Sequence, residues 1–348
     1  MKSNIITMRG AAAAEPDPDQ NLAAFLRRRI IGQDEAINAI APYVQLFQSG
    51  LAPAGRPAGV FLLLGPTGTG KTRTVEALAE ALHGHERHIL RVDCGEFQLD
   101  HEVAKLIGAP PGYLGHRETQ PMISQQKLNA ASSERCPLSL VLFDEIEKAA
   151  GSLNRLLLGV LDKATLKLGD NTAVNFERSL IFLTSNLGAR EMQDHLSDTF
   201  GFAAPGTHAR QPSAKLHSIA LRAVRRRFSP EFVNRVDQTI TYSPLTRRDF
   251  EAILDIQMKD LDQHLAQRLG PRAFRVELSA EARELLLNAG TSTRYGAREL
   301  KRAIHRHVIQ RIAALVVEGL AHPGGVVRVE KARGRDEVIL RPRRREAA

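Results

Sequence analysis

Short, almost purely apolar runs recur along the first two thirds of the chain. Four of them, at residues 60–64, 88–93, 138–143 and 179–184, predict β-strands. Runs that are apolar at consecutive positions are typical of parallel strands buried on both faces. Helical stretches lie between them, as at residues 74–82, and two helices precede the first strand, at residues 21–29 and after Gln33. This alternation predicts a doubly wound α/β fold.

The pattern changes at about Ser243, where long helical stretches replace the alternation. Helices are predicted at residues 245–269, 280–287 and 297–320, with Ser279 as an N-cap, and short strands at residues 273–277 and 325–329. These elements indicate a smaller, mainly helical α+β domain. The expected organisation is a flexible leader at residues 1–20, a large domain at 21–243, a small C-terminal domain at 244–341 and a basic tail at 342–348.

The first strand leads into a loop that carries the clearest chemical signal. Its residues are Gly65, Pro66, Thr67, Gly68, Thr69, Gly70, Lys71 and Thr72. A strand followed by G-x-x-x-x-G-K-T and a helix is the phosphate-binding loop of nucleoside triphosphate enzymes. Backbone N–H groups cradle the phosphates, Lys71 brings a positive charge to them, and the Thr72 hydroxyl is placed for Mg²⁺. The loop therefore predicts a nucleoside triphosphate and Mg²⁺ as ligands.

Two further strands end in polar residues suited to hydrolysis. Asp144 and Glu145 follow the strand at residues 138–143, and Asn186 follows the strand at residues 179–184. Asp144 is placed to hold Mg²⁺ through its water shell, and Glu145 is the candidate base that polarises the attacking water. Asn186 is expected to bond that water or the γ-phosphate. In parallel sheets ligands lie at the carboxyl ends of the strands, where all three residues fall.

Composition and charge limit the classes of protein to which the chain can belong. The chain has 348 residues, a net charge of +9 and two cysteines, Cys94 and Cys136. The sequence contains no run of about 18 apolar residues, so no membrane span is predicted. Its N-terminus does not resemble a secretory signal. Two unclustered thiols suit a reducing cytoplasm. The basic runs lack interleaved aromatic residues, so they do not favour nucleic acid as a partner.

Together these motifs resemble the AAA+ ATPases, specifically the C-terminal ATPase module of the Clp-type protein unfoldases and disaggregases. The resemblance covers residues 26–329. It implies that Ile31, within residues 30–36, lies over the adenine. It also implies an arginine finger, Arg235, acting on a neighbouring subunit, and a second sensor, Arg298, contacting phosphate. Residues 106–115 resemble the pore loop, whose substrate-gripping part is Gly112, Tyr113, Leu114 and Gly115.

The function that this resemblance implies is an ATP-hydrolysing motor, with ATP/ADP and Mg²⁺ as its cofactors. It would form a homo-oligomeric ring, most simply a hexamer, and thread unfolded or tagged proteins through its pore. The alternatives are a nucleic-acid-associated AAA+ ATPase, such as a clamp or helicase loader, and a regulatory nucleotide-binding module with little turnover. Phe200-Gly201-Phe202 is similar to a tripeptide with which Clp unfoldases dock on a ClpP-like peptidase, although a plain loop is the simpler interpretation.

Overall fold

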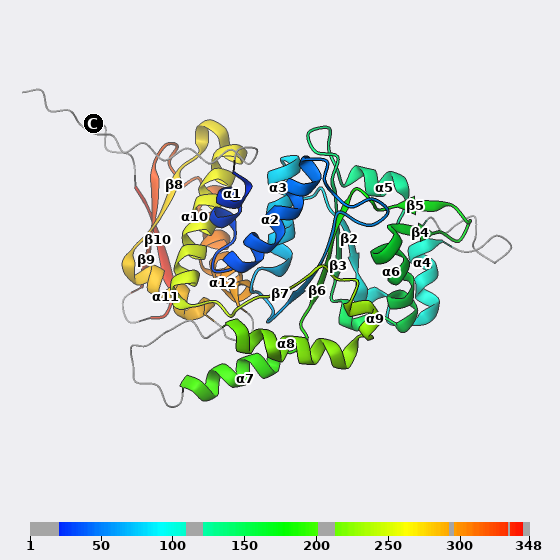
Figure 1. Ribbon diagram of the computed structural model, residues 1–348. Helices are drawn as coiled ribbons and strands as arrows, with labels where there is room; N and C mark the ends of the chain where they lie inside the picture. Colours follow the sequence, from blue (N-terminus) through cyan, green and yellow to red (C-terminus); the bar gives the residue numbers. More distant parts are fainter. Residues whose placement is uncertain (1–20, 109–120, 201–212, 292–295, 333–334, 344–348) are drawn as a thin grey trace, which may run out of the picture.

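A five-stranded parallel sheet forms the centre of the first two thirds of the chain (Figure 1). The computed structural model describes residues 21–108, 121–200, 213–291, 296–332 and 335–343. The strands are β1 (Gly59–Leu64), β2 (Leu90–Asp93), β3 (Ser139–Asp144), β6 (Ser179–Ser185) and β7 (Gln238–Thr241), in the order β2-β3-β6-β1-β7. Strand β1 pairs in parallel with β6 on one side and β7 on the other. The predicted doubly wound fold is confirmed.

Both faces of this sheet are covered by helices. Successive side chains of a strand point to opposite faces. Accordingly, Val60 and Leu62 belong to one core cluster, whereas Phe61 and Leu63 belong to another. Helices α1 (Leu22–Arg29), α2 (Asp34–Gln48) and α3 (Lys71–His83) pack on the second face. On the first face lie α4 (Val103–Ile107), α5 (Gln125–Ala130), α6 (Gly151–Lys163), α7 (Ala189–Phe200), α8 (Ser213–Arg227) and α9 (Pro230–Val233).

Several short elements were not evident in the apolar pattern. A hairpin of β4 (Thr165–Lys167) and β5 (Ala173–Asn175) follows α6, and α7 and α8 occupy a stretch that reads as a polar insert. Single turns of 3₁₀-helix lie at Cys94–Glu96, Asp100–Glu102, Ile146–Lys148 and Gly270–Arg272. Such elements are too short or too polar to produce a clear hydrophobic period.

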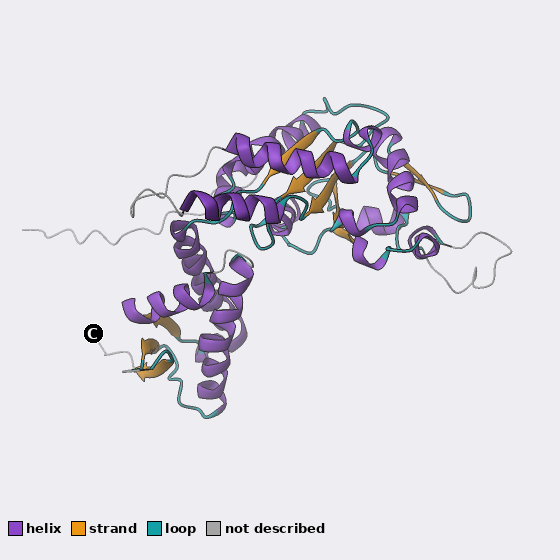
Figure 2. Ribbon diagram, turned by 90° about the horizontal axis from the view of Figure 1, so that it is seen from below, coloured by secondary structure: helices purple, strands orange, loops and turns teal. Residues whose placement is uncertain are grey.

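The C-terminal part has its own sheet and core, and it projects from the α/β domain (Figure 2). Its helices are α10 (Arg247–Leu269), α11 (Ala280–Gly290), α12 (Ala297–Ile304) and α13 (Gln310–Val317). A π-helical turn, His305–Ile309, joins the last two, so the predicted single helix is continuous but irregular. The sheet runs β10-β9-β8, from β8 (Arg275–Leu278), β9 (Val326–Lys331) and β10 (Val338–Arg343). Ser279 caps α11 as expected.

Strand β10 corrects the sequence interpretation of the C-terminus. The charge pattern places Pro342 and Arg343 in a basic tail, whereas the structure pairs them with Val327 and Val326 of β9. A proline is tolerated here because β10 is an edge strand. Within the described ranges, no helix is long and apolar enough to cross a membrane.

Candidate nucleotide site

The loop between β1 and α3 has the backbone shape that its glycines allow. Gly65, Gly68 and Gly70 all have positive φ, at 139°, 76° and 108°. Residues other than glycine rarely adopt such backbone angles, so glycine at these positions lets the chain curl tightly. Gly70 is the N-cap of α3 and Lys71 is its first residue. The helix therefore directs its N-terminus, with its partial positive charge, at the loop.

Lys71 is buried within this loop. Its Nζ donates hydrogen bonds to the carbonyl oxygens of Gly65 (2.7 Å) and Pro66 (2.9 Å) and to Oδ1 of Asn186 (2.9 Å). The pKa of Lys71 is lowered to about 8, mainly by burial and also by the charge of Arg298, and the charges of Glu147, Asp144 and Glu145 partly oppose this shift. A buried ammonium whose bonds go to neutral oxygens is well suited to receive a phosphate anion.

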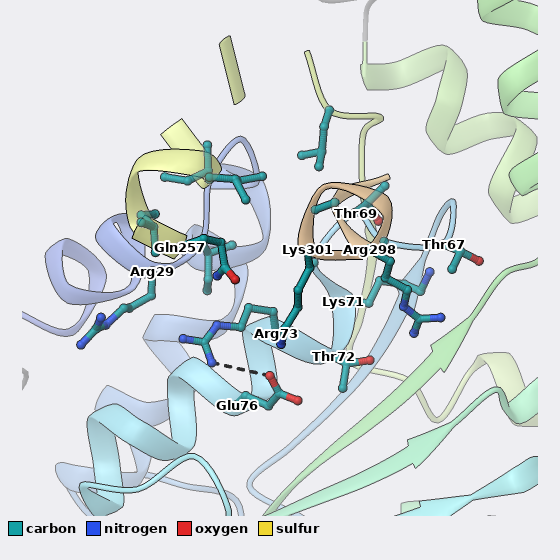
Figure 3. A pocket seen from close by; sticks show the side chains of 18 of the residues that line it. Arg29, Thr67, Thr69, Lys71, Thr72, Arg73, Glu76, Gln257, Arg298 and Lys301 are labelled. Carbon is teal, nitrogen blue, oxygen red and sulfur yellow. Dashed lines mark ion pairs between the residues drawn. The ribbon is translucent and has the colours of Figure 1, made fainter. Parts of the chain in front are cut away.

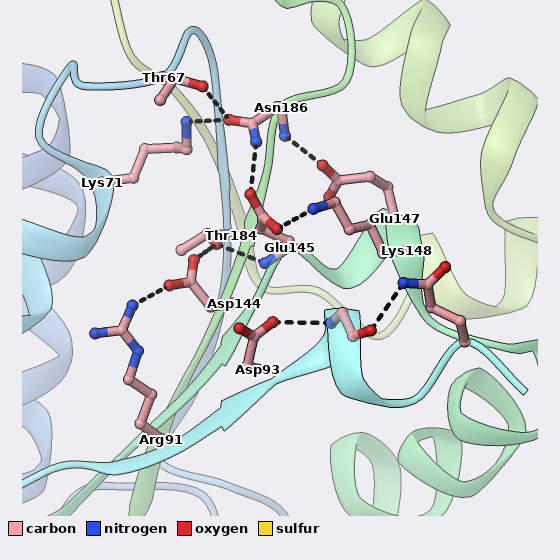
Figure 4. Close-up of polar contacts among 12 residues, drawn as sticks. Thr67, Lys71, Arg91, Asp93, Asp144, Glu145, Glu147, Lys148, Thr184 and Asn186 are labelled. Atoms are coloured by element: carbon pink, nitrogen blue, oxygen red, sulfur yellow. Dashed lines mark hydrogen bonds and ion pairs between the residues drawn. The ribbon is translucent and has the colours of Figure 1, made fainter. Parts of the chain in front are cut away.

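The two acids at the end of β3 are oriented by a threonine on the next strand (Figure 4). The Thr184 hydroxyl donates to Oδ1 of Asp144 and accepts the backbone N–H of Glu145 at 3.1 Å. Arg91, from β2, donates to the other oxygen of Asp144. Asp144 is thus held from both neighbouring strands.

Glu145 stands in a left-handed backbone conformation, with φ at 57°. Such a conformation is uncommon for a residue with a side chain and is concentrated at functional sites. Its carboxylate pairs with Lys148 at 2.5 Å and accepts from Nδ2 of Asn186 at 3.5 Å. The hydrogen bond to Glu145 raises the pKa of Lys148. The backbone N–H of Asn186 bonds Glu147 at 3.1 Å. Asn186 therefore connects the candidate base to Lys71.

A cleft of about 930 Å³ opens beside these residues, between the α/β domain and the C-terminal part. Figure 3 shows Arg298 of α12 beside Lys71. Predicted ligand residues that line the cleft are Ile31, Thr67, Gly68, Thr69, Gly70, Lys71, Thr72, Asp144, Glu145, Asn186 and Arg298. Apolar side chains from both parts, including Ile30, Ile253 and Ile304, complete the lining. Phosphate-binding and apolar surfaces in one cleft suit a nucleotide.

The C-terminal part touches the phosphate-binding loop directly. Ala297 donates its backbone N–H to the carbonyl of Gly68 at 3.0 Å. The preceding Gly296 has a φ of 54°, and a Cβ there would lie 2.7 Å from the Gly68 oxygen. Only glycine permits this approach, which places Arg298 over the loop.

The other predicted functional residues lie elsewhere. Arg235 does not line the cleft, and it pairs with Glu231 (2.8 Å) and Asp162 (3.5 Å). The predicted pore-loop residues 112–115, together with Gly201 and Phe202, lie outside the described residues. In the described ranges no group of three or more His, Cys, Asp or Glu side chains is arranged to hold a metal ion.

Sequence patterns missed four residues of the polar network: Arg91, Glu147, Lys148 and Thr184. Each acts on a residue far away in the sequence or through a backbone turn, so no local motif reveals them. The sequence could have indicated two of them only by their place at strand ends, because Arg91 and Thr184 are near the carboxyl ends of the strands that flank β3.

The fold and the cleft together define a phosphate-loop nucleotide-binding protein with a second, C-terminal unit. The chain belongs to the AAA family, since the model described as "AAA domain (Cdc48 subfamily)" matches residues 56–239. A second model, the C-terminal D2-small domain of ClpB protein, matches residues 245–329. The Clp-type resemblance inferred from the motifs is confirmed.

Similar proteins agree with this assignment. The chain is 35% identical to the ATP-binding subunit ClpC of the Clp protease of Staphylococcus epidermidis, and 38% identical to the chaperone ClpB of Pseudomonas putida. Each alignment spans 91% of this chain but only 37% and 34% of the relative, so the chain spans about a third of their length.

Two solved structures are also similar. One is a closed state of Hsp104 with ATPγS and casein, with a TM-score of 0.77 and 27% identity, covering 95% of this chain and 53% of that one. The other is an extended conformation of the Saccharomyces cerevisiae Hsp104:casein complex, with a TM-score of 0.79, 26% identity and the same coverage.

Proposed function

We propose that this chain is an ATP-hydrolysing subunit of a ring-shaped motor that remodels proteins. The observation that carries the proposal is the hydrogen-bonded connection from Lys71 through Asn186 to Glu145, beside a cleft to which the C-terminal part contributes Arg298. It joins a phosphate-binding cation, a sensor of its position and a candidate base. Phosphoryl transfer requires mainly such positioning and charge stabilisation.

Each residue has a distinct task in this proposal. The ammonium of Lys71 moves from the carbonyls of Gly65 and Pro66 to the outer phosphates. Thr72 and Asp144 would hold Mg²⁺, which would supply positive charge to stabilise the transferred phosphate. Glu145 exchanges its Lys148 partner for the attacking water and orients it. Asn186 couples the position of the phosphates to that of Glu145, because its side chain bonds both Lys71 and Glu145.

The proposed ring explains why Arg235 lies outside the cleft of its own chain. In one chain its guanidinium pairs with Glu231 and Asp162 and lies outside the cleft. In the proposed ring, most simply a hexamer, Arg235 completes the site of the adjacent subunit. An arginine at this place accelerates phosphoryl transfer by about 10³–10⁵-fold.

The proposed substrate is an unfolded or tagged polypeptide. Support comes from the similar Hsp104 structures, in which casein is the bound protein. Tyr113, flanked by Gly112 and Gly115, is proposed to grip the polypeptide in the pore. Docking on a ClpP-like peptidase through Phe200-Gly201-Phe202 stays a prediction.

Steady-state ATP hydrolysis tests the proposal. Glu145→Gln should bind nucleotide but hydrolyse it at least about 100-fold more slowly, because the base is lost. Glu134→Gln, which alters an exposed carboxylate, is the matched control and should behave as wild type. Casein, but not single-stranded DNA, should change the rate. Equal turnover by wild type and Glu145→Gln would refute the proposed chemistry, and stimulation by DNA alone would favour the nucleic-acid alternative.

A further inference from the structure

Gln33 is a buried polar side chain to which the mechanism above gives no role. It stands at the N-cap position of α2, yet its side chain makes no capping bond to that helix, and it is 4% exposed. Its Nε2 donates to the carbonyl oxygens of Thr69 (3.1 Å) and Ser243 (2.9 Å), and its Oε1 accepts the N–H of Ser243 at 3.2 Å. Both donor hydrogens of the amide are therefore used.

The first of these bonds fixes a peptide of the phosphate-binding loop. The described part of the chain has no cis peptide bond, so the C=O of Thr69 and the N–H of Gly70 point in opposite directions. By holding the carbonyl, Gln33 fixes the Gly70 N–H on the opposite side of the peptide, and the N–H groups of a phosphate-binding loop are the ones that bind the anion. A bound anion polarises that peptide and strengthens the bond to Gln33.

The other two bonds fix the segment that leads to the C-terminal part. This connecting segment, residues 242–246, joins β7 to α10. Gln33 bonds both the N–H and the C=O of Ser243, as a neighbouring strand would. The same segment is anchored one residue earlier, where Tyr242 donates its N–H to Leu64 at 2.7 Å and its hydroxyl to Thr74 at 2.8 Å.

We propose that Gln33 is a positioning residue that links the phosphate-binding loop to the connecting segment, so that nucleotide in the loop sets the orientation of the C-terminal part. This inference rests on the proposed nucleotide-driven function. Gln33 makes the link because one rigid planar amide bonds the Thr69 carbonyl and the Ser243 backbone at the same time. A shift of either backbone leaves a buried amide group unpaired unless the other follows, and that penalty transmits the movement.

Two substitutions separate the link from simple packing. Gln33→Met keeps the length of the side chain but removes all three hydrogen bonds. Gln33→Glu can still accept the N–H of Ser243, but it places a carboxylate oxygen against the carbonyl oxygens of Thr69 and Ser243. Gln125→Glu is the matched control, because Gln125 also donates to a side chain (Asn129) and accepts a backbone N–H (Asn175), away from the cleft. Each variant is checked for folding by thermal melting.

The experiment measures nucleotide affinity and interdomain distance in the full chain. Dyes are placed on Gln48→Cys and Arg272→Cys, both exposed, and Cys94 and Cys136 are buried. Labelled subunits are diluted into unlabelled ones, and energy transfer is followed during titration with ATPγS and Mg²⁺. In wild type and Gln125→Glu, saturation should shift the transfer efficiency. In the Gln33 variants, affinity should fall about tenfold and the shift at saturation should fall below half of the wild-type value.

The outcomes are distinguishable. A full shift at saturation in Gln33→Met would overturn the link, even if affinity is reduced. A wild-type chain that binds ATPγS without any shift would overturn it as well. Absence of ATPγS binding by the wild type would instead overturn the proposed function on which the link depends. If Gln33→Glu fails to melt cooperatively, Gln33→Met decides.

Discussion

Thr184→Val tests whether the threonine hydroxyl organises the hydrolytic acids. Thr184 is 1% exposed, and valine replaces its hydroxyl with a methyl group of similar size. The change removes the donor to Asp144 and takes away the acceptor of the Glu145 N–H. Glu145 already holds a left-handed conformation, which costs about 1–3 kcal/mol and persists only while its surroundings impose it.

The expected loss follows from these contacts. A buried donor that loses its partner costs about 1–3 kcal/mol. If most of this results in misplacement of Glu145, kcat should fall by about 10- to 100-fold. KM should change less, because the ammonium of Lys71, which is proposed to bind the phosphates, makes its hydrogen bonds to Gly65, Pro66 and Asn186. Thr184→Ser retains the hydroxyl and should keep kcat within about threefold of wild type.

The assay is steady-state ATP hydrolysis over a range of ATP concentrations, with ATPγS affinity measured separately. The reasoning would be refuted if Thr184→Val retained wild-type kcat. It would also fail if Thr184→Ser were as impaired as the valine variant, since the effect would then come from packing and not from the hydroxyl.

Two further predictions concern the loop. The Lys71 ammonium, whose pKa burial lowers to about 8, loses its charge as pH rises through that value, so ATPγS affinity should be about tenfold weaker at pH 9 than at pH 7. Lys71→Arg, which stays charged, should remove this pH dependence whatever its overall affinity, and an unchanged slope would contradict the assignment. Gly296→Ala places a methyl group against the Gly68 carbonyl and should weaken ATPγS binding about tenfold. Gly319→Ala also places alanine at a positive φ, 69°, but has no atom within 4 Å of its Cβ and should bind normally.

The main architecture was predictable because its signals are local. Strands such as β1 and β6 are apolar at nearly every position, and α11 begins at a capping serine. The hairpin β4–β5 has three-residue strands, and β10 carries charges and a proline on a sheet edge. Elements of this kind owe their conformation to partner strands, not to their own hydrophobic pattern.

The residues of the site also divide into those that a local motif predicts and those that only the structure reveals. Lys71, Asp144 and Glu145 belong to contiguous motifs, so the sequence indicates them and the cleft brings them together. Gln33 and Ser243 lie 210 residues apart. Their contact depends on how the first helices and the connecting segment pack, and no spacing along the chain encodes it.

The central claim, that ATP hydrolysis drives protein unfolding, is tested most directly with a tagged fluorescent reporter protein. Wild type should abolish the reporter's fluorescence only when ATP is present. Tyr113→Ala should still hydrolyse ATP but leave the reporter folded, because it lacks the proposed grip. If both proteins hydrolyse ATP and neither unfolds the reporter, the motor account is contradicted.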